Sequence, residues 1–168
     1  MVHIEPWGSG NLALLQGLLC DPAMMEHLGG PETPKKIAER QRRYEQPGSN
    51  QFRIVSDGEE VGWVGFWERE HRGETVYEMG WSVLPAFQGR GIAGRATHLA
   101  LEEARAAGGP RFVHASPDVD NAASNAICRK AGFELLGAYD DEYPPGTPRR
   151  LNDWRVDLRP QEGPPRAR

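Results

Sequence analysis

The chain has 168 residues and a net charge of −4, with 38% hydrophobic and 26% charged residues. This length fits one domain with its own core, and the composition is typical of a soluble globular protein. The acidic balance argues against broad nucleic-acid binding, no apolar run could span a bilayer, and the N-terminus lacks the features of a signal peptide, so we expect a cytoplasmic protein with no membrane partner.

The first fifty residues predict one strand followed by helices. The strand is expected at residues 2–7, and a compact apolar helix at 11–19. A short helical turn is expected up to Gly30. A charged helix follows over residues 32–45, with Thr33 as its N-cap. Because it has few apolar residues, we expect this helix to lie over the rim of a site and not in the core.

The hydrophobic pattern then changes from helical to alternating, which predicts an antiparallel meander. Its three strands are expected at residues 51–56, 61–70 and 75–83. Gly80 lies inside the third strand and Pro85 closes it. These two residues predict a bulge or a splayed strand end, where a ligand can approach the backbone.

The second half of the chain predicts a β-α-β crossover with parallel strands. Helices are expected at residues 93–107 and 121–131, and strands at 111–116, 133–139 and, after a polar loop at 140–150, at 152–158. We therefore predict one α+β domain over residues 1–158, with a mixed central sheet of six to seven strands flanked by helices. The Pro- and Arg-rich residues 159–168 are predicted to be disordered.

The cysteines and histidines lack the spacing of a metal site. Two cysteines stand far apart, and the five histidines contain no HExxH pattern. We therefore predict neither a disulfide framework nor a bound metal.

The turn before the helix at 93–107 has the features of an anion site. Gly89, Gly91 and Gly94 allow the backbone to come close to a ligand, and the first N–H groups of the helix point at it. The helix dipole adds positive potential, so a phosphate or pyrophosphate is the expected guest. Glu78 lies on the strand just before and is placed for proton chemistry beside that guest.

Two blocks of sequence resemble motifs of the GCN5-related N-acetyltransferase (GNAT) family. Gln88-Gly-Arg-Gly-Ile-Ala93 matches the signature Q/R-x-x-G-x-G/A, and residues 121–133 resemble the motif N-x-x-S/A…K-x-G-F. Residues 21–30 are similar to the ribosomal-protein alanine acetyltransferase (RimJ/RimL-like) branch. The resemblance covers residues 1–158. It implies the GNAT fold and transfer of an acetyl group from acetyl-CoA directly to a primary amine, through a ternary complex.

The resemblance also implies where acetyl-CoA binds. The pyrophosphate would lie on the glycine turn, and the pantetheine arm would run along the end of the third meander strand. A backbone N–H near Val83 would then polarise the thioester carbonyl. The residues assigned to the cofactor are Trp81, Ser82, Val83, Gln88, Gly89, Arg90, Gly91, Ile92, Ala93, Gly94, Asn121 and Asn125.

Two residues are candidates for proton transfer. Glu78 is the expected general base, with Glu68 as second choice; the alternative is a glutamate that only faces solvent. Many relatives protonate the leaving thiolate with a tyrosine, but Cys128 occupies that position here. The resemblance to the ribosomal-protein branch, which carries a serine proposed for this role at the position of Ser124, implies Ser124 as the candidate acid, although it could instead bond only the helix backbone or CoA. Cys128 is expected to be a buried, unreactive side chain.

The sequence indicates the binding site of the amine acceptor less clearly than that of the cofactor. Candidates for its binding are Trp67, His114, Asp140 and Tyr143, because acidic and aromatic groups suit a cationic amine. The alternatives are that Trp67 only packs on the sheet, that His114 is a strand histidine whose hydrogen bonds are satisfied within the protein, and that the acidic run at Asp140 is a solvated loop. The acceptor could be a protein N-terminus or a small polyamine or aminoglycoside. A domain that binds acyl-CoA without turnover is the alternative function, and a homodimer is left open.

Overall fold

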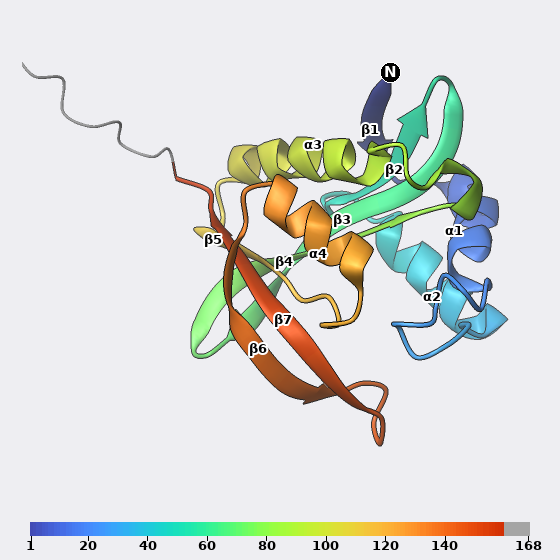
Figure 1. Cartoon of the computed structure of the whole chain (residues 1–168). Helices are drawn as coiled ribbons and strands as arrows, with labels where there is room; N and C mark the ends of the chain where they lie inside the picture. The colour runs from blue at the N-terminus through green and yellow to red at the C-terminus, as the bar shows by residue number, and fades with distance from the viewer. Residues whose placement is uncertain (160–168) are drawn as a thin grey trace, which may run out of the picture.

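Within residues 1–159, which the computed structural model describes, seven strands form one sheet (Figure 1). The strand order is β1-β2-β3-β4-β5-β7-β6, and β4 and β5 are the parallel pair. The predicted α+β fold with a mixed central sheet is therefore confirmed. The strands are Val2–Pro6 (β1), Gln51–Ser56 (β2), Glu59–His71 (β3), Glu74–Val83 (β4), Phe112–Ala115 (β5), Glu134–Glu142 (β6) and Pro148–Asp157 (β7).

Helices cover both faces of this sheet. The described residues contain α1 (Leu12–Leu19), α2 (Pro34–Tyr44), α3 (Ile92–Ala107) and α4 (Ala122–Lys130), with 3₁₀ turns at Ser9–Asn11 and Pro85–Phe87. Val64 and Phe66 on β3 belong to the core cluster beneath α3, whereas Trp63 packs against the cluster formed by α1 and α2. Because neighbouring strand residues point to opposite faces, α3 and the pair α1/α2 lie on opposite sides of the sheet.

The N-terminal helices differ from the prediction in two ways. Thr33 caps α2 as expected, accepting a hydrogen bond from the N–H of Lys36 at 3.3 Å. However, α2 does not lie at a rim: Ile37 and Tyr44 are buried with Gln41 along one helix face. The i, i+4, i+7 spacing places these three residues on one stripe, so a helix with few apolar residues can still bury one face.

The short helical turn expected from Asp21 to Gly30 is present only as hydrogen-bonded turns over residues 22–29. The N–H of Met25 donates to the carbonyl of Asp21 at 3.1 Å, but no regular helix follows. The carboxylate of Asp21 accepts hydrogen bonds from the N–H groups of Ala23 and Met24 at 2.8 and 3.1 Å. This is the bonding pattern of a helix N-cap, so Asp21 starts a helical turn.

The β6–β7 hairpin is longer than predicted. Residues 140–142 continue β6 and residues 148–150 begin β7, so the polar loop is reduced to residues 143–147. Acidic residues of β6 face basic residues of β7: Asp140 forms an ion pair with Arg150 at 2.8 Å, and Asp141 lies opposite Arg149. Opposite charges on facing strands stabilise a ladder. The acidic run expected to be a solvated loop is therefore strand.

The end of β4 is splayed away from β5. The sequence predicted either a bulge or a splayed strand end at this point, and the second alternative is the one observed. β4 pairs with β5 at Tyr77 and Glu78, and β3 pairs with β4 in an unbroken register on the other side. The bulge expected at Gly80 is absent from this register. A Cβ at Gly80 would lie 2.8 Å from the Trp63 ring, so the glycine makes room for an indole.

Two further findings bear on the predicted limits of the chain. Among residues 1–159, no helix is long and apolar enough to cross a membrane. The disordered tail predicted for residues 159–168 falls, except for Arg159, outside the described part of the chain.

The core beneath α3 gives a stability prediction. Phe66 is 0% exposed and packs against Tyr77 and Phe52, with ring centroids 5.0 and 6.2 Å away. Phe66→Ala is expected to lower the free energy of unfolding by about 3–5 kcal/mol, measured by denaturant titration. Leu136→Ala on β6, which is 40% exposed, is the control and should change it by less than about 0.5 kcal/mol. Equal losses in the two variants would contradict this assignment of the core.

Candidate active site

The opening between β4 and β5 exposes backbone groups of β4. The N–H of Leu84 donates to the carbonyl of Val61 on β3 at 2.8 Å. Because successive N–H groups of a strand point in opposite directions, those of Trp81 and Val83 point away from β3, where β5 has separated. The backbone of Ser82 instead faces β3, with its carbonyl close to Gly62. An extended ligand could pair with this free edge as an added strand.

The glycine turn that follows is open to a ligand. Gly91 is the N-cap of α3 with a φ of 74°, and Gly89 has the same φ. The space around the Cβ positions of Gly89, Gly91 and Gly94 is empty to 4 Å. The N–H groups of the first turn of this 16-residue helix therefore have room for an anion, and the helix dipole favours it.

The side chains of this turn are used within the protein. Gln88 donates from Nε2 to the carbonyl of Val83 at 2.9 Å, which ties the turn to the end of β4. Arg90 donates to the carbonyl of Ala86 at 2.9 Å. Ile92 is buried and Ala93 packs against the core. The turn therefore offers a ligand its backbone, and contacts from these side chains stay predictions.

The two asparagines of α4 have different roles. Asn121 caps the helix, accepting from the N–H of Ser124 at 3.1 Å. Asn125 is buried, and its amide makes four hydrogen bonds, with the carbonyls of Asp118 and Asn121 and the side chains of Asn152 and Trp154. These bonds use both of its donors and both lone pairs of its oxygen. The predicted contact of Asn125 with the cofactor is therefore wrong.

Three further side chains lie along α4 and at the end of β5. Ser124, in the first turn of α4, is half-buried. Cys128 is 0% exposed, and burial raises the pKa of its thiol to about 12, so it is the unreactive side chain that we expected. The buried hydroxyl of Ser116, just after β5, has no hydrogen-bond partner among residues 1–159. Sequence reasoning overlooked Ser116, which nothing in its local pattern distinguishes.

Glu78 lies where β4 and β5 separate. Its side chain is 18% exposed and forms an ion pair with Arg69 of β3. Burial raises the pKa of the Glu78 carboxyl, against the opposing effects of Arg69 and His114. A carboxylate with a raised pKa is a better proton acceptor than an ordinary glutamate. Glu68, the second choice, is exposed and lies opposite Tyr77 of the core, on the other face of the sheet.

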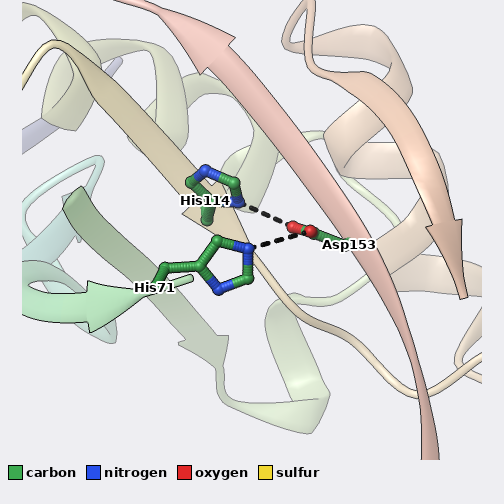
Figure 2. Close-up of side chains that lie close together, drawn as sticks. All are labelled: His71, His114 and Asp153. Atoms are coloured by element: carbon green, nitrogen blue, oxygen red, sulfur yellow. Dashed lines mark hydrogen bonds and ion pairs between the residues drawn. The ribbon is translucent and has the colours of Figure 1, made fainter. Parts of the chain in front are cut away.

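A buried carboxylate joins two histidines (Figure 2), one of which, His114, is the register partner of Glu78. Asp153 of β7 contacts Nδ1 of His114 on β5 through Oδ1 at 2.6 Å, and Nε2 of His71 on β3 through Oδ2 at 3.2 Å. Asp153 and His114 are 1% and 3% exposed. His114 is therefore held in a network, and its Nδ1 fits the alternative of a satisfied strand histidine; a contact between His114 and the acceptor stays a prediction.

This network is the place among the described residues where donor atoms of metal-binding type gather, within 4.8 Å of one another. Each of those donor atoms already faces a hydrogen-bond partner in the network. The guanidinium of Arg69 also lies 3.3 Å from the second nitrogen of His71 and would repel a cation. We therefore interpret the cluster as a hydrogen-bonded network, and the lack of a metal stays a prediction.

The remaining acceptor candidates lie in two places. Trp67 is 39% exposed and directly opposite Glu78 in the β3–β4 register, with its ring stacked on Trp63. Asp140 is an exposed residue of β6, paired with Arg150. Tyr143 lines a separate depression of about 300 Å³ between the hairpin and residues 26–29. The structure brings Trp67, Glu78 and His114 together and leaves Asp140 and Tyr143 apart from them.

Sequence reasoning missed Arg69 and Asp153. Asp153 stands between Asn152 and Trp154 in a strand of mixed polar and apolar residues, so nothing in its local pattern marks it as buried. Arg69 alternates with the exposed Glu68 and Glu70, which made the whole run look solvated.

Comparisons with known proteins agree with this fold. The model of the family described as "Acetyltransferase (GNAT) domain" matches residues 2–134. No curated protein matches the chain in sequence. Among solved structures, ribosomal-protein-alanine N-acetyltransferase from Brucella melitensis is 22% identical, with a TM-score of 0.76 over 92% of this chain and 99% of that one.

Two further solved structures are similar. RimL, a ribosomal L7/L12 alpha-N-protein acetyltransferase in complex with coenzyme A, is 21% identical, with a TM-score of 0.75 over 93% of each chain. Aminoglycoside acetyltransferase AAC(6')-Ib is 17% identical, with a TM-score of 0.72 over 94% of this chain and 95% of that one. Two of these three relatives come from the ribosomal-protein branch that the sequence resembles. Since the family model covers most of the chain, the protein belongs to the GNAT family of acyl-CoA-dependent N-acetyltransferases.

Proposed function

We propose that the protein transfers the acetyl group of acetyl-CoA directly to a primary amine, in a complex that holds both substrates. One observation carries this proposal: the splayed end of β4 lies between the open glycine turn and the half-buried carboxylate of Glu78. A donor bound along β4 would present its thioester where a carboxylate can take a proton from the attacking amine. RimL, which is similar in fold, is described in complex with coenzyme A.

The donor half of the site fits the chemistry of acetyl-CoA. The pyrophosphate would bind the N–H groups at the start of α3, and the pantetheine amides would pair with Trp81 and Val83. The N–H of Val83 would stabilise the oxyanion of the tetrahedral intermediate. The unpartnered hydroxyl of Ser116 marks a polar position near the end of β5 that a ligand could satisfy. Ser124 is our candidate for the proton donor to the leaving thiolate.

The acceptor half favours an amine with one ammonium group. Trp67 and Glu78 offer one aromatic face and one carboxylate. The acids that the structure groups here are Glu78, which pairs with Arg69, and the buried Asp153, which His71 and His114 hold. A polycation would need several unpaired acids. We therefore propose a protein N-terminus as the acceptor, in preference to a polyamine or an aminoglycoside. RimL is named for the first class of acceptor and AAC(6')-Ib for aminoglycosides.

An amine panel tests this proposal. The purified protein is incubated with acetyl-CoA and peptides with a free alanine or serine N-terminus, a linear polyamine or an aminoglycoside, and the released thiol and acetylated product are measured. We expect release with the peptides and little with the polycations. If no amine releases thiol while calorimetry still shows acetyl-CoA binding, the alternative of a non-catalytic acyl-CoA sensor is favoured.

Trp67 gives a prediction for the acceptor alone. Trp67→Ala is expected to raise KM for the amine roughly 3- to 30-fold, because a cation–π contact contributes about 0.5–2 kcal/mol, and to leave the Kd for acetyl-CoA unchanged. Trp67→Phe keeps an aromatic face and should retain most of the affinity. An unchanged KM in Trp67→Ala would remove this residue from the acceptor site.

A further inference from the structure

The hydrogen bonds around Asp153 determine which nitrogen of each histidine carries a proton (Figure 2). Nη2 of Arg69 lies 3.3 Å from Nδ1 of His71. A guanidinium only donates hydrogen bonds, so this Nδ1 accepts, and the proton of His71 is on Nε2. Burial lowers the pKa of His71, which keeps the ring neutral. His71 therefore donates from Nε2 to Oδ2 of Asp153 at 3.2 Å.

The same reasoning extends to His114. Although burial opposes it, the hydrogen bonds from His114 and His71 lower the pKa of Asp153, so this carboxyl is ionised. An ionised carboxylate only accepts hydrogen bonds. Nδ1 of His114, 2.6 Å from Oδ1, therefore carries a proton. The lone pair of a neutral His114 is then on Nε2, on the far side of the ring from Asp153.

His114 lies at the point where the sheet opens. His114 and Glu78 form the last pair between β4 and β5, after which the strands separate. Within residues 1–159, no protein hydrogen bond occupies Nε2 of His114. The charged or titratable groups around His114 are Glu78 from β4, Arg69 and His71 from β3, and Asp153 and Arg155 from β7. When His114 is neutral, the network thus presents an imidazole lone pair beside the carboxylate.

Acetylation of an amine requires two proton transfers from nitrogen. An ammonium carries three protons and the product amide carries one, so two must leave. Glu78 supplies one acceptor. We propose, on the basis of the function proposed above, that His114 is a second proton acceptor of this active site, and that Asp153, His71 and Arg69 are positioning residues that hold its Nε2 free. Such a carboxylate–imidazole pair has the same logic as the hydrolase triads, in which the acid fixes the tautomer of the base.

The proposed reaction balances as follows. Glu78 takes the first proton from the ammonium, and the neutral nitrogen attacks the thioester carbonyl carbon. The new C–N bond gives a tetrahedral intermediate, whose nitrogen passes a second proton to Nε2 of His114. The C–S bond then breaks, and its electron pair leaves with sulfur. One of the two protons ends on the CoA thiol and the other in solvent, which restores both acceptors.

The protonation pattern can be tested without a substrate. Two-bond ¹H–¹⁵N spectra of the full chain distinguish imidazole protonated on Nδ1 from imidazole protonated on Nε2. The neutral rings are expected to carry the proton on Nε2 in His71 and on Nδ1 in His114. A neutral His114 with its proton on Nε2 would overturn the proposal, whatever the activity of the enzyme.

Asp153→Asn tests the link between the two rings. An asparagine can accept from one imidazole N–H but presents an NH₂ group to the other, so one ring must change its tautomer. We expect the spectrum of His71 or His114 to change and kcat to fall about 10²-fold or more, with the Kd for acetyl-CoA unchanged. Unchanged tautomers together with an unchanged kcat would contradict the positioning role.

His114→Gln tests the proton acceptor itself, with the amine that the panel identifies. We expect kcat to fall about 10²-fold or more and the Kd for acetyl-CoA to stay the same. His98→Gln, which changes an exposed histidine of α3, is the matched control and should be fully active. A His114→Gln enzyme with normal kcat would overturn the proposal. If the wild type acetylates no amine, the proposed function fails instead, and the spectra still decide whether the network exists.

Discussion

A Gly91→Val variant is expected to lose at least about 10²-fold in affinity for acetyl-CoA. Gly91 begins α3 with a φ of 74°, and the space next to its Cα is empty. A branched side chain would fill the space through which a pyrophosphate reaches the helix N-terminus. Loss of two hydrogen bonds to a charged group costs about 3–6 kcal/mol, which corresponds to this fold-change or more. Isothermal titration with CoA measures the effect.

The chain contains a matched control at the other end of the same helix. Gly108 ends α3 with a φ of 69°, so Gly108→Val introduces the same left-handed strain of about 1–3 kcal/mol. Both variants are expected to lose comparable stability on thermal unfolding. Gly108→Val should bind CoA normally. If Gly91→Val also binds normally, or if both variants lose affinity equally, the phosphate site is not at this turn.

The elements that the sequence predicted well are determined by neighbouring residues. Asp57 and Gly58 both adopt positive φ, 52° and 88°, which makes the tight turn between β2 and β3. Gly108 ends α3, and the side chain of Asn121 caps α4. Each of these signals acts within a few residues of the chain, so composition and order suffice to find it.

The β6–β7 hairpin illustrates what local reasoning omits. Its strands contain Asp, Glu, Arg and Pro, which are typical of a loop. Pairing across the hairpin makes strand favourable, because Asp140 and Arg150 come together only when both strands are formed. The stabilisation depends on contact with a distant partner, and the sequence of either strand alone does not contain it.

The network at Asp153 has the same explanation. Asp153 lies 39 residues from His114 and 82 residues from His71 along the chain. The strand order β3-β4-β5-β7 brings three different strands together at this point. His114 could be singled out as a histidine in a strand, but its role depends on a carboxylate that reads as one more charge near the C-terminus. The predicted glycine turn is continuous in sequence, whereas the proton network is assembled from three separate strands, and its carboxylate was missed.

Glu78→Gln is expected to lower kcat by about 10²–10⁴-fold, with little change in the Kd for acetyl-CoA. Glutamine keeps the shape of the side chain and can still accept a hydrogen bond from Arg69, but it cannot take a proton from an ammonium. Burial raises the pKa of Glu78, so the wild-type base is lost by protonation at a higher pH than an ordinary glutamate. The wild-type kcat/KM should therefore fall as pH falls through this raised pKa, and that limb should be missing in the variant.

Glu68→Gln is the comparison that makes this result specific. Glu68 is one residue from Trp67 on β3, is exposed, and lies on the opposite face of the sheet from Glu78. Its replacement removes the same charge from the neighbouring strand, so any effect of net charge on substrate binding appears in both variants. Only Glu78→Gln should lose the acid limb of the pH profile. If Glu78→Gln keeps that limb and a normal kcat, the base is another group, and the carboxylate with Arg69 serves to hold the ammonium in place.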